Sequence, residues 1–361
     1  MKRLIYLLMP VLMAMVSVSC GREPLPQGQD GKDPVLETME ATGVSQTKAT
    51  LNAKLEMDGV QYAELVCGFK LGTSDRRLDQ FLSCEKTGNA YSTSLSALTD
   101  NTKYWYQAYA KVDGKEYSGA IISFTTEKLP KGAVNLGFVM TREDGTEYTL
   151  FWAESNLCES GLCAKPEDYG DYYAWAETEP YYTEGHSQDR PCTSWRPGRS
   201  TYYWPSYKWC NGAYDKLTKY CHTTKKNYWD GEGNPDGMTS LEDNGYKDDV
   251  ARVKLGGKWR IPTYAEWKEL MNRCVWTWTT RNRVNGRVVA VPPGGNSIFL
   301  PAAGRWQTTG ITDAGEFGYY YASTLTTSPE YADDIKVGPE EVFGSFGARC
   351  FGKSIRPVWE E

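Results

Sequence analysis

GGKWRIPTYAEWKELMNRC, residues 256–274, combines a glycine turn, a Trp-Arg pair and the beginning of a helix. Thr263 and Glu266 have the Thr-x-x-Glu spacing of a capping box, and Pro262 lies directly before them. The apolar residues that follow recur at helical spacing and give the helix one face for burial. These residues are Trp267, Leu270, Met271 and Cys274. The stretch therefore predicts a helix from about residue 264 to residue 274.

The residues around this helix predict further scaffold. In KDDVARVKL, residues 247–255, Asp248 or Asp249 can cap a second helix. The apolar residues expected to pack from that helix are Val250 and Val253. Arg260 lies between Trp259 and a proline, where a guanidinium can stack on the indole and bond to loop carbonyls. We expect these residues to hold the frame rather than to bind a ligand.

Six blocks of sequence in 133–361 follow one another in an order that resembles the Fibrobacter succinogenes major paralogous domain. The blocks are PEDYGDYYAWAETEP (166–180), YKWCNGAYDKLTKYC (207–221), GGKWRIPTYAEWKEL (256–270), CVWTWTTRNRVNGRVV (274–289), NSIFLPAAGRW (296–306) and FGKSIRPV (351–358). The group is common in exported Bacteroidetes proteins and is related to the formylglycine-generating-enzyme version of the C-type lectin fold. The resemblance implies an α+β domain with two helices, a twisted antiparallel sheet and long loops that carry recognition. The motif residues expected to be structural are Asp248, Asp249, Trp259, Arg260, Thr263, Glu266, Trp267 and Arg356.

Residues 35–127 alternate between apolar and polar side chains, which is typical of strands with one buried face. The residues predicted to face the core are Ala49, Leu51, Ala53 and Leu55, followed by Tyr104, Tyr106, Ala108 and Ala110. SALTDNTKYWYQAYAKVDGKEYSGAIISFTT, residues 96–126, resembles the second half of a fibronectin type III domain. That resemblance implies a spacer, and EKLPKG (127–132) predicts the hinge after it. The predicted fold class is multidomain: an all-β fibronectin type III-like sandwich followed by an α+β C-type-lectin-like domain.

The N-terminal sequence MKRLIYLLMPVLMAMVSVSC has a cationic start, an apolar run and small residues before Cys20. It predicts a signal peptide over 1–19. The residues next to Cys20 resemble the lipobox of bacterial lipoproteins, which implies an acylated cysteine; an ordinary signal peptide is the alternative. Residues 20–34 then form the lipidated cysteine and a flexible tether. The expected location is the outer membrane, reached through a lipid anchor and facing the cell surface, with the periplasmic side left open.

The amino-acid composition limits which classes of partner and which cysteine chemistry are expected. The net charge is −6, and no basic stripe follows the aromatic residues, so nucleic acid is not an expected partner. The chain has 13 Trp and 25 Tyr, and Trp105 is the one Trp before residue 130. Ten cysteines in an exported protein favour disulfides. Cys158 and Cys163 can close a small loop, and Cys274 with Cys350 can form a long-range bridge, but the sequence leaves the connectivity open.

Catalysis is not predicted. The enzyme relatives bind copper with a close pair of cysteines near the C-terminus, whereas Cys350 is alone in the last 80 residues. His186 and His222 lie in separate loops, and the carboxylates Glu177 and Glu179 are more typical of solvated loop charges than of a glycosidase pair.

No cofactor is predicted, with calcium left open. In DGEGNPDG, residues 230–237, four oxygen-bearing side chains alternate as a calcium cage requires. They are Asp230, Glu232, Asn234 and Asp236. Pro235 replaces the turn glycine of the EF-hand pattern and no glutamate follows at the twelfth place, which favours a hydrophilic turn over a metal site.

Two aromatic regions are candidates for ligand recognition, because aromatic side chains give a large contact area at a small entropy cost. The first is 172–209, where Tyr172, Tyr173, Trp175, Tyr207 and Trp209 are expected to fill the core. The second is 304–353, which corresponds in the family to the ligand face. The candidate ligand-binding residues of the two regions are Trp195, Tyr202, Tyr203, Arg305, Trp306, Tyr321, Ser323, Tyr331, Phe343 and Phe346.

The sequence thus predicts a non-catalytic envelope lipoprotein that binds a glycan or a host or bacterial surface protein through loops of its C-terminal domain. Three alternatives stay open: a pilus tip adhesin, a variable binding protein diversified by a retroelement, and an enzyme related to formylglycine-generating enzymes or active on glycans.

Overall fold

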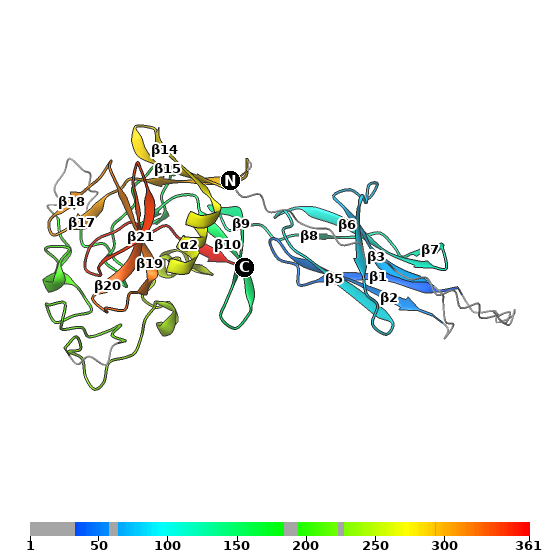
Figure 1. Ribbon diagram of the computed structural model, residues 1–361, viewed down its shortest axis with the longest axis horizontal. Helices are drawn as coiled ribbons and strands as arrows, with labels where there is room; N and C mark the ends of the chain where they lie inside the picture. The colour runs from blue at the N-terminus through cyan, green and yellow to red at the C-terminus, as the bar shows by residue number, and fades with distance from the viewer. Residues whose placement is uncertain (1–32, 58–63, 184–193, 223–226, 293) are drawn as a thin grey trace, which may run out of the picture.

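The computed structural model of the chain describes residues 33–57, 64–183, 194–222, 227–292 and 294–361. Within these residues the protein is mostly antiparallel β-sheet, and its sheets fall into two groups that lie end to end along the long axis (Figure 1). No sheet contains strands from both groups. The predicted signal peptide, Cys20 and most of the tether lie outside the described residues. The described part of the chain has no helix that is long and apolar enough to cross a bilayer.

The N-terminal group consists of two sheets with one core between them. The first has the strand order β1 (Val35–Thr42), β2 (Ala49–Glu56) and β5 (Ala90–Leu95). The second has the order β4 (Gln80–Cys84), β3 (Leu65–Gly72), β6 (Lys103–Val112) and β7 (Lys115–Ser118), and β8 (Ile122–Thr125) pairs with β6. All eight residues predicted from the period-two pattern to face this core are buried in it.

The C-terminal group has five sheets. Four strands follow the order β13 (Trp259–Arg260), β22 (Val358–Glu360), β10 (Glu147–Ala153) and β9 (Ala133–Thr141). Two three-stranded sheets consist of β14 (Val275–Arg281), β15 (Val284–Ala290) and β16 (Ser297–Pro301), and of β19 (Gly318–Leu325), β20 (Tyr331–Val337) and β21 (Val342–Ala348). Two short pairs are β11 (Leu157–Cys158) with β12 (Gly161–Leu162), and β17 (Arg305–Gln307) with β18 (Gly310–Thr312).

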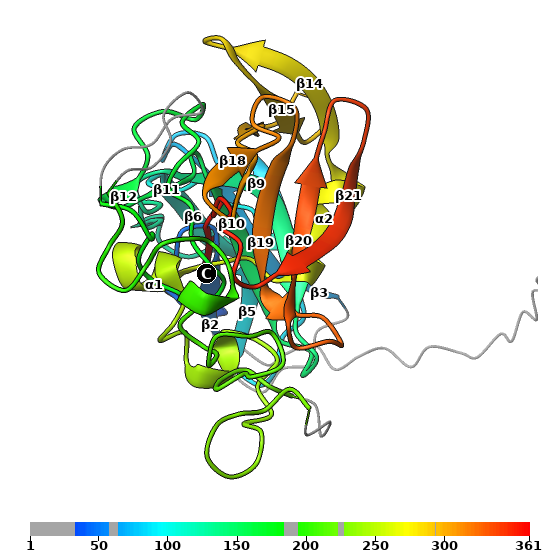
Figure 2. The same ribbon diagram turned by 90° about the vertical axis from the view of Figure 1, so that its left-hand side faces the viewer.

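The helices of this group are short. They are α1 (Val250–Leu255), α2 (Tyr264–Arg273) and the 3-10 turns η1 (Trp204–Ser206) and η2 (Glu242–Asn244). Figure 2 shows β19, β20 and β21 side by side with α2 behind them, and the β14–β15 hairpin extending away from the body. The largest core of this group lies where α2 meets β9, β10, β16, β19 and β20. From α2, Trp267 and Leu270 are buried in this core, as predicted.

The capping box that the opening stretch predicts is present. The Thr263 side chain accepts a hydrogen bond from the Glu266 amide, and the Glu266 carboxylate accepts one from the Thr263 amide at 2.7 Å. The helix ends at Arg273, with Cys274 as its C-cap, within one residue of the predicted end. The predicted cap of α1 is also confirmed: Asp249 accepts from the amides of Ala251 and Arg252.

The prediction for Arg260 was partly wrong. The Arg260 guanidinium donates to the Ile261 carbonyl, but its main partners are two carboxylates and no stacking on Trp259 is found among the described residues. Arg260 Nη1 donates to Glu266 Oε2 at 2.8 Å, and Nη2 donates to Glu360 Oε2 at 2.9 Å. Trp259 instead packs with residues of β10 and β22. Glu360 was not predicted as a partner because β22 reaches β13 from the far end of the chain.

Two further expectations require correction. Val253 does not pack, since the six-residue α1 buries Val250 and turns Val253 to solvent. Cys158 and Cys163 form the predicted disulfide, but Cys274 and Cys350 are free thiols. Cys274 packs against the α2 core, whereas Cys350 lies in a separate aromatic core, so the two sulfurs face different clusters.

Arg356 has the structural role that was predicted for it. The side chain is fully buried, and its guanidinium donates to Asn156 Oδ1 at 2.9 Å and to the carbonyls of Ala153 and Phe299 at 2.9 and 2.7 Å. The guanidinium therefore ties the segment before β22 to two distant parts of the chain.

Candidate functional site: an aromatic pocket

A pocket of about 710 Å³ opens on the C-terminal group of sheets and is lined mainly by aromatic side chains. Its lining residues are Tyr203, Trp204, Tyr214, Tyr228, Arg305, Gln307, Glu330, Tyr331, Phe346, Gly347, Ala348 and Phe351. We call it the aromatic pocket. Its volume lies within the range of small-molecule sites, and its lining combines aromatic rings with polar and charged groups.

Side chains of strand β17 alternate between its two sides, and the polar side chains on one side form a wall of the pocket. Arg305 and Gln307 line the pocket, while Trp306 between them points to the opposite side and is buried. There the Trp306 indole contacts a layer of rings, stacking on Tyr182 with ring centroids 5.3 Å apart and packing on Tyr202 at 5.5 Å. The buried layer fixes β17 and thereby holds Arg305 toward the pocket.

The ends of β20 and β21 form a second wall. Tyr331 opens β20, and its ring lies 5.4 Å from the ring of Phe346 on β21. Phe346 is 61% exposed, which leaves most of its ring free for a ligand. A Cβ at Gly347 next to it would lie 2.6 Å from the Lys353 ammonium below, so any other residue there would displace that ammonium. That ammonium is buried and paired with Asp334.

Irregular segments supply the remaining aromatic rings. Trp204 of η1 lies 6.5 Å from Tyr214, and Tyr214 lies 6.4 Å from Tyr228, measured between ring centroids. Tyr203 precedes η1 in an extended conformation and is half exposed. Rings from three segments thus surround one opening, each held by neighbouring rings rather than by regular secondary structure.

Glu330 is the carboxylate of the described lining. Its side chain is 7% exposed, and Tyr228 Oη donates to its Oε1 at 3.2 Å. Oε2 is buried and has no hydrogen-bond partner among the residues that the structure describes. Burial and the Glu330 charge both raise the pKa of Tyr228, so the phenol remains a donor at neutral pH.

Arg305 is the cation of the described lining, and it too has an atom without a hydrogen-bond partner. Its guanidinium carbon lies 4.6 Å from the ring of Tyr319 and 5.7 Å from that of Phe351. Its Nε is buried without a hydrogen-bond partner, and the guanidinium forms no ion pair with a described residue. Stacking on rings orients a guanidinium but leaves its donors for another group.

Four of the ten predicted ligand-binding residues meet in this pocket: Tyr203, Arg305, Tyr331 and Phe346. Phe343 is exposed on the same strand as Phe346 but does not line the pocket, because it lies toward the other end of β21 beside Lys336. Trp195 is half-buried beneath the pocket, where its ring contacts Trp306 and Tyr202.

The other four predicted ligand-binding residues belong to the core, and the prediction was wrong for them. They are Tyr202, Trp306, Tyr321 and Ser323. Tyr202 and Trp306 face the buried layer of rings. Tyr321 and Ser323 lie on β19, which has cores on both faces: Tyr320 packs into one and Tyr321 into the other. The phenol oxygen of Tyr321 lies 3.0 and 2.9 Å from the Ala348 and Phe351 carbonyls, so its one proton is bonded within the protein and is not available to a ligand.

Sequence reasoning missed Tyr214, Tyr228, Glu330 and Phe351. Each is an isolated residue in an irregular segment, where periodicity carries no information about which side chains share a face. The available signal was composition, since Tyr214 and Tyr228 follow the same aromatic-rich region as Tyr203. Glu330 carried no signal that would set it apart from other acidic loop residues.

The four candidate calcium ligands of DGEGNPDG do not converge in the structure. Asp236 accepts hydrogen bonds from the amides of Tyr220 and Cys221 at 2.7 and 2.8 Å, and Asp230 accepts one from Asn211 at 3.0 Å. The two carboxylates thus hold separate turns, and Glu232 and Asn234 are exposed. Among the described residues no three metal-ligating side chains come together.

The tertiary structure places two further cysteines, Cys210 and Cys221, in the same core cluster as Cys350. Cys210 lies in that cluster, and its Sγ donates to the Trp204 carbonyl at 3.2 Å. Burial raises the pKa of both the Cys350 and the Cys210 thiol. Protonated buried thiols are poor nucleophiles and poor metal ligands.

Glu177 and Glu179 differ in environment. Glu177 is buried, with Arg199 paired to its Oε2 and Tyr181 donating to its Oε1. Glu179 is half exposed and lies near Arg196 and Lys254. Neither lines the aromatic pocket.

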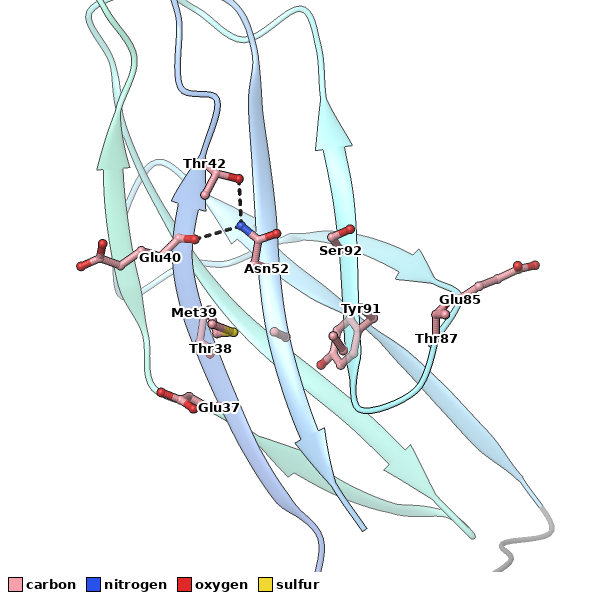
Figure 3. Close-up of a pocket in the computed structure, with 12 residues that line it drawn as sticks. Glu37, Thr38, Met39, Glu40, Thr42, Asn52, Glu85, Thr87, Tyr91 and Ser92 are labelled. Atoms are coloured by element: carbon pink, nitrogen blue, oxygen red, sulfur yellow. Dashed lines mark hydrogen bonds between the residues drawn. The ribbon is translucent and has the colours of Figure 1, made fainter.

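A second hollow, of about 740 Å³, lies on the N-terminal sheet formed by β1, β2 and β5 (Figure 3). Its polar groups bond to one another: Asn52 donates to the Glu40 carbonyl at 3.0 Å and to Thr42 Oγ1 at 3.1 Å. Tyr91 donates to the Tyr109 carbonyl. Because its described buried side chains are satisfied within the protein, this hollow is the weaker candidate.

Comparisons with known proteins add little. No protein-family model matches the chain, and no curated protein matches it. One similar solved structure is the sensor domain of the anti-sigma factor RsgI4 in Pseudobacteroides cellulosolvens, with 14% identity, a TM-score of 0.22, and coverage of 27% of this chain and 96% of that one. The solution structure of that sensor domain has 13% identity and a TM-score of 0.21, and covers 27% of this chain and 76% of the other. A likeness of this size carries no information on function.

Proposed function

We propose that this protein is a non-catalytic lipoprotein of the bacterial cell envelope that captures a glycan in the aromatic pocket. The observation that carries the proposal is the pocket itself, in which exposed rings surround two uncommitted charged groups, Arg305 and Glu330. Aromatic rings can lie flat against the apolar faces of sugar rings, while charged and amide groups bond to hydroxyls. Gln307 supplies the amide.

The wider assignment rests on sequence resemblance. In this proposal Cys20 carries the lipid, residues 35–127 form a fibronectin type III-like spacer, and residues 133–361 form a C-type-lectin-like domain of the Fibrobacter succinogenes major paralogous group. The pocket would then lie on the recognition face of that domain, with the spacer between it and the membrane.

Binding without turnover is the preferred function because of the charges in the pocket. Glycoside hydrolysis uses two carboxyl groups on either side of the scissile bond. Glu330 is the one carboxylate of the described lining, and its neighbours there are a phenol and aromatic rings. A lone carboxylate suits hydrogen bonding to a ligand.

A glycan array tests the proposal with residues 21–361, which lack the site of lipidation. We expect the wild-type protein to bind a restricted set of glycans, and Phe346→Ala and Tyr203→Ala to weaken that binding at least tenfold. Both side chains are exposed, so the two substitutions should leave the melting temperature unchanged.

Phe343→Ala is the matched control, because it removes an exposed ring from the same strand outside the pocket. Equal loss of binding in Phe343→Ala and Phe346→Ala would show that the binding site lies outside the aromatic pocket. Release of reducing sugar during incubation would contradict binding without turnover.

A further inference from the structure

The pocket contains two opposite charges that do not neutralise each other. Glu330 and Arg305 both line it, yet no ion pair joins them, and neither forms an ion pair with another described residue. Side chains of opposite charge that share a small pocket usually pair unless the fold holds them apart. Here the Tyr228 phenol hydrogen-bonds to Glu330. The rings of Tyr319 and Phe351 pack against Arg305.

Other charged groups nearby lie outside the pocket lining and have partners within the protein. Lys353 and Asp334, below Gly347, pair with each other and are fully buried. The Arg349 guanidinium donates to the Lys219, Tyr220 and Pro329 carbonyls, and the Arg349 amide donates to the Glu330 carbonyl. The charge offered to a ligand is therefore one negative group at Glu330 and one positive group at Arg305.

Each of the two groups has a buried atom that lacks a partner. Glu330 Oε2 and Arg305 Nε are both buried without a hydrogen bond to the described residues. An unsatisfied buried polar atom costs about 1–3 kcal/mol, and more when the group is charged. Asp334 Oδ1 and Arg349 Nε also lack partners but do not line the pocket, so Glu330 and Arg305 are the two such charged groups in its described wall.

Glu330 and Arg305 have different surroundings, and these determine which ligand group each of them can bind. Glu330 bonds to Tyr228, which continues into the row of rings formed with Tyr214 and Trp204. Aromatic rings beside a carboxylate are the environment that recognises an organic ammonium group. Arg305 offers a planar set of donors, which suits a phosphate or carboxylate.

We propose that the aromatic pocket binds a zwitterionic group, with an organic ammonium at Glu330 among the rings and a phosphate or carboxylate at Arg305. This inference rests on the proposed function, since it names the substituent by which the pocket would select its glycan. It also excludes a ligand class: a neutral sugar leaves both unsatisfied atoms without a charged partner and binds weakly.

Calorimetric titration of residues 21–361 with four small probes tests this inference. Phosphocholine and phosphoethanolamine carry both charges, choline carries the cation alone, and glycerol 3-phosphate carries the anion alone. We expect each zwitterion to bind at least tenfold more tightly than either single-charge probe. Affinity should fall when salt is raised, because part of it is electrostatic.

Two charge-removing substitutions assign the charges. Glu330→Gln keeps a group that can accept from Tyr228, and should reduce phosphocholine binding to the level of glycerol 3-phosphate. Arg305→Gln should reduce it to the level of choline. Glu341→Gln, which neutralises an exposed carboxylate before β21, is the control and should change nothing. Melting curves of all three variants verify folding.

Vesicles distinguish the source of the zwitterion. Binding to phosphatidylcholine vesicles that is lost in Glu330→Gln would assign the same chemistry to a lipid headgroup, whereas binding to the soluble probes alone would assign it to a soluble or glycan-borne group. Equal affinity for all four probes, or phosphocholine binding that survives both substitutions, would overturn the inference. Pocket-dependent binding of neutral glycans on the array, with no response to the zwitterions, would do so while leaving the proposed function intact.

Discussion

Arg260 joins two elements by ion pairs inside the protein. Its guanidinium is almost fully buried and lies between the carboxylates of Glu266 in α2 and Glu360 in β22. Burial alone would raise the pKa of Glu266, but the Arg260 guanidinium holds it below its usual value. A buried charge is stable only while its partner is present.

Arg260→Met should therefore lower the free energy of unfolding by about 3–5 kcal/mol, because it leaves the buried Glu266 carboxylate without its cation, while Glu360 keeps Arg142 as a partner. Urea unfolding followed by tryptophan fluorescence measures the change. Lys268→Met, which removes an exposed cation from α2, is the control and should stay within about 0.5 kcal/mol of wild type. Equal effects of the two substitutions would contradict a role for the ion pairs.

Asp249 couples stability to pH. Its carboxylate caps α1 and also accepts from the Ile261 amide at 2.8 Å, and burial raises its pKa to about 6. The folded protein therefore holds this proton more tightly than the unfolded chain, whose aspartates titrate near pH 3.9. Because the folded state binds more protons between these values, this group's contribution to stability is full below about pH 4 and is lost as the pH rises through 6.

Asp249→Asn removes the titrating group while keeping an oxygen that can cap the helix. The stability of wild type relative to the variant should fall by on the order of 3 kcal/mol between pH 4 and pH 7. Urea unfolding at several pH values measures the difference, with the exposed Asp215→Asn as the control. A difference that is constant with pH, or that grows toward pH 7, would show that Asp249 is not the group responsible.

At the scale of single elements, the short helix α2 depends on its first turn. Its amphipathic face packs on β19, β20 and β21, and its N-terminal amides are satisfied by the Thr263–Glu266 capping box. A helix of ten residues is too short to be stable alone, so packing and capping must act together.

Thr263→Ala should lower the free energy of unfolding by about 1 kcal/mol, because the Glu266 amide loses its acceptor. Thr263→Ser keeps the hydroxyl and should retain most of the stability. Thermal unfolding of both variants, read by circular dichroism, distinguishes the cap from the loss of a methyl group. If Ser and Ala destabilise equally, the hydroxyl does not provide the cap.

At the scale of the whole molecule, the two groups of sheets touch through a polar contact. Thr47, in the turn before β2, donates through its amide to the Glu361 carboxylate at 2.8 Å, and its hydroxyl bonds to the same carboxylate. Residues 127–132 connect the two groups nearby, and Gln46 donates to Glu127 at 3.0 Å. These contacts restrict the connection without merging the two cores.

Glu361→Ala should release this contact and speed tryptic cleavage after Lys128 and Lys131 several-fold, because local opening controls access to the connection. Both lysines are already exposed, so the melting temperatures of the two parts should not change. Mass spectrometry of timed digests identifies the cut sites, with Glu340→Ala as the control. Cleavage rates equal to those of wild type would show that Glu361 does not restrain the connection.

The features that the sequence determined by itself are those with local causes. The buried faces of β2 and β6 follow from alternation, the start of α2 follows from the Thr263–Glu266 spacing, and the Cys158–Cys163 disulfide closes a loop of neighbours in sequence. In each case the interacting groups lie within a few residues or on one element, so the periodicity of that element is sufficient.

Only the tertiary structure decided which aromatic residues are available to a ligand. Alternation shows that Arg305 and Trp306 point to opposite sides, but which side is covered depends on Tyr182 and Tyr202, more than a hundred residues earlier. The same reason places Tyr321 in a core and brings Glu330 to the rings of the pocket. Burial is a property of what packs on a face, and that partner is set by the folded chain rather than by neighbouring residues.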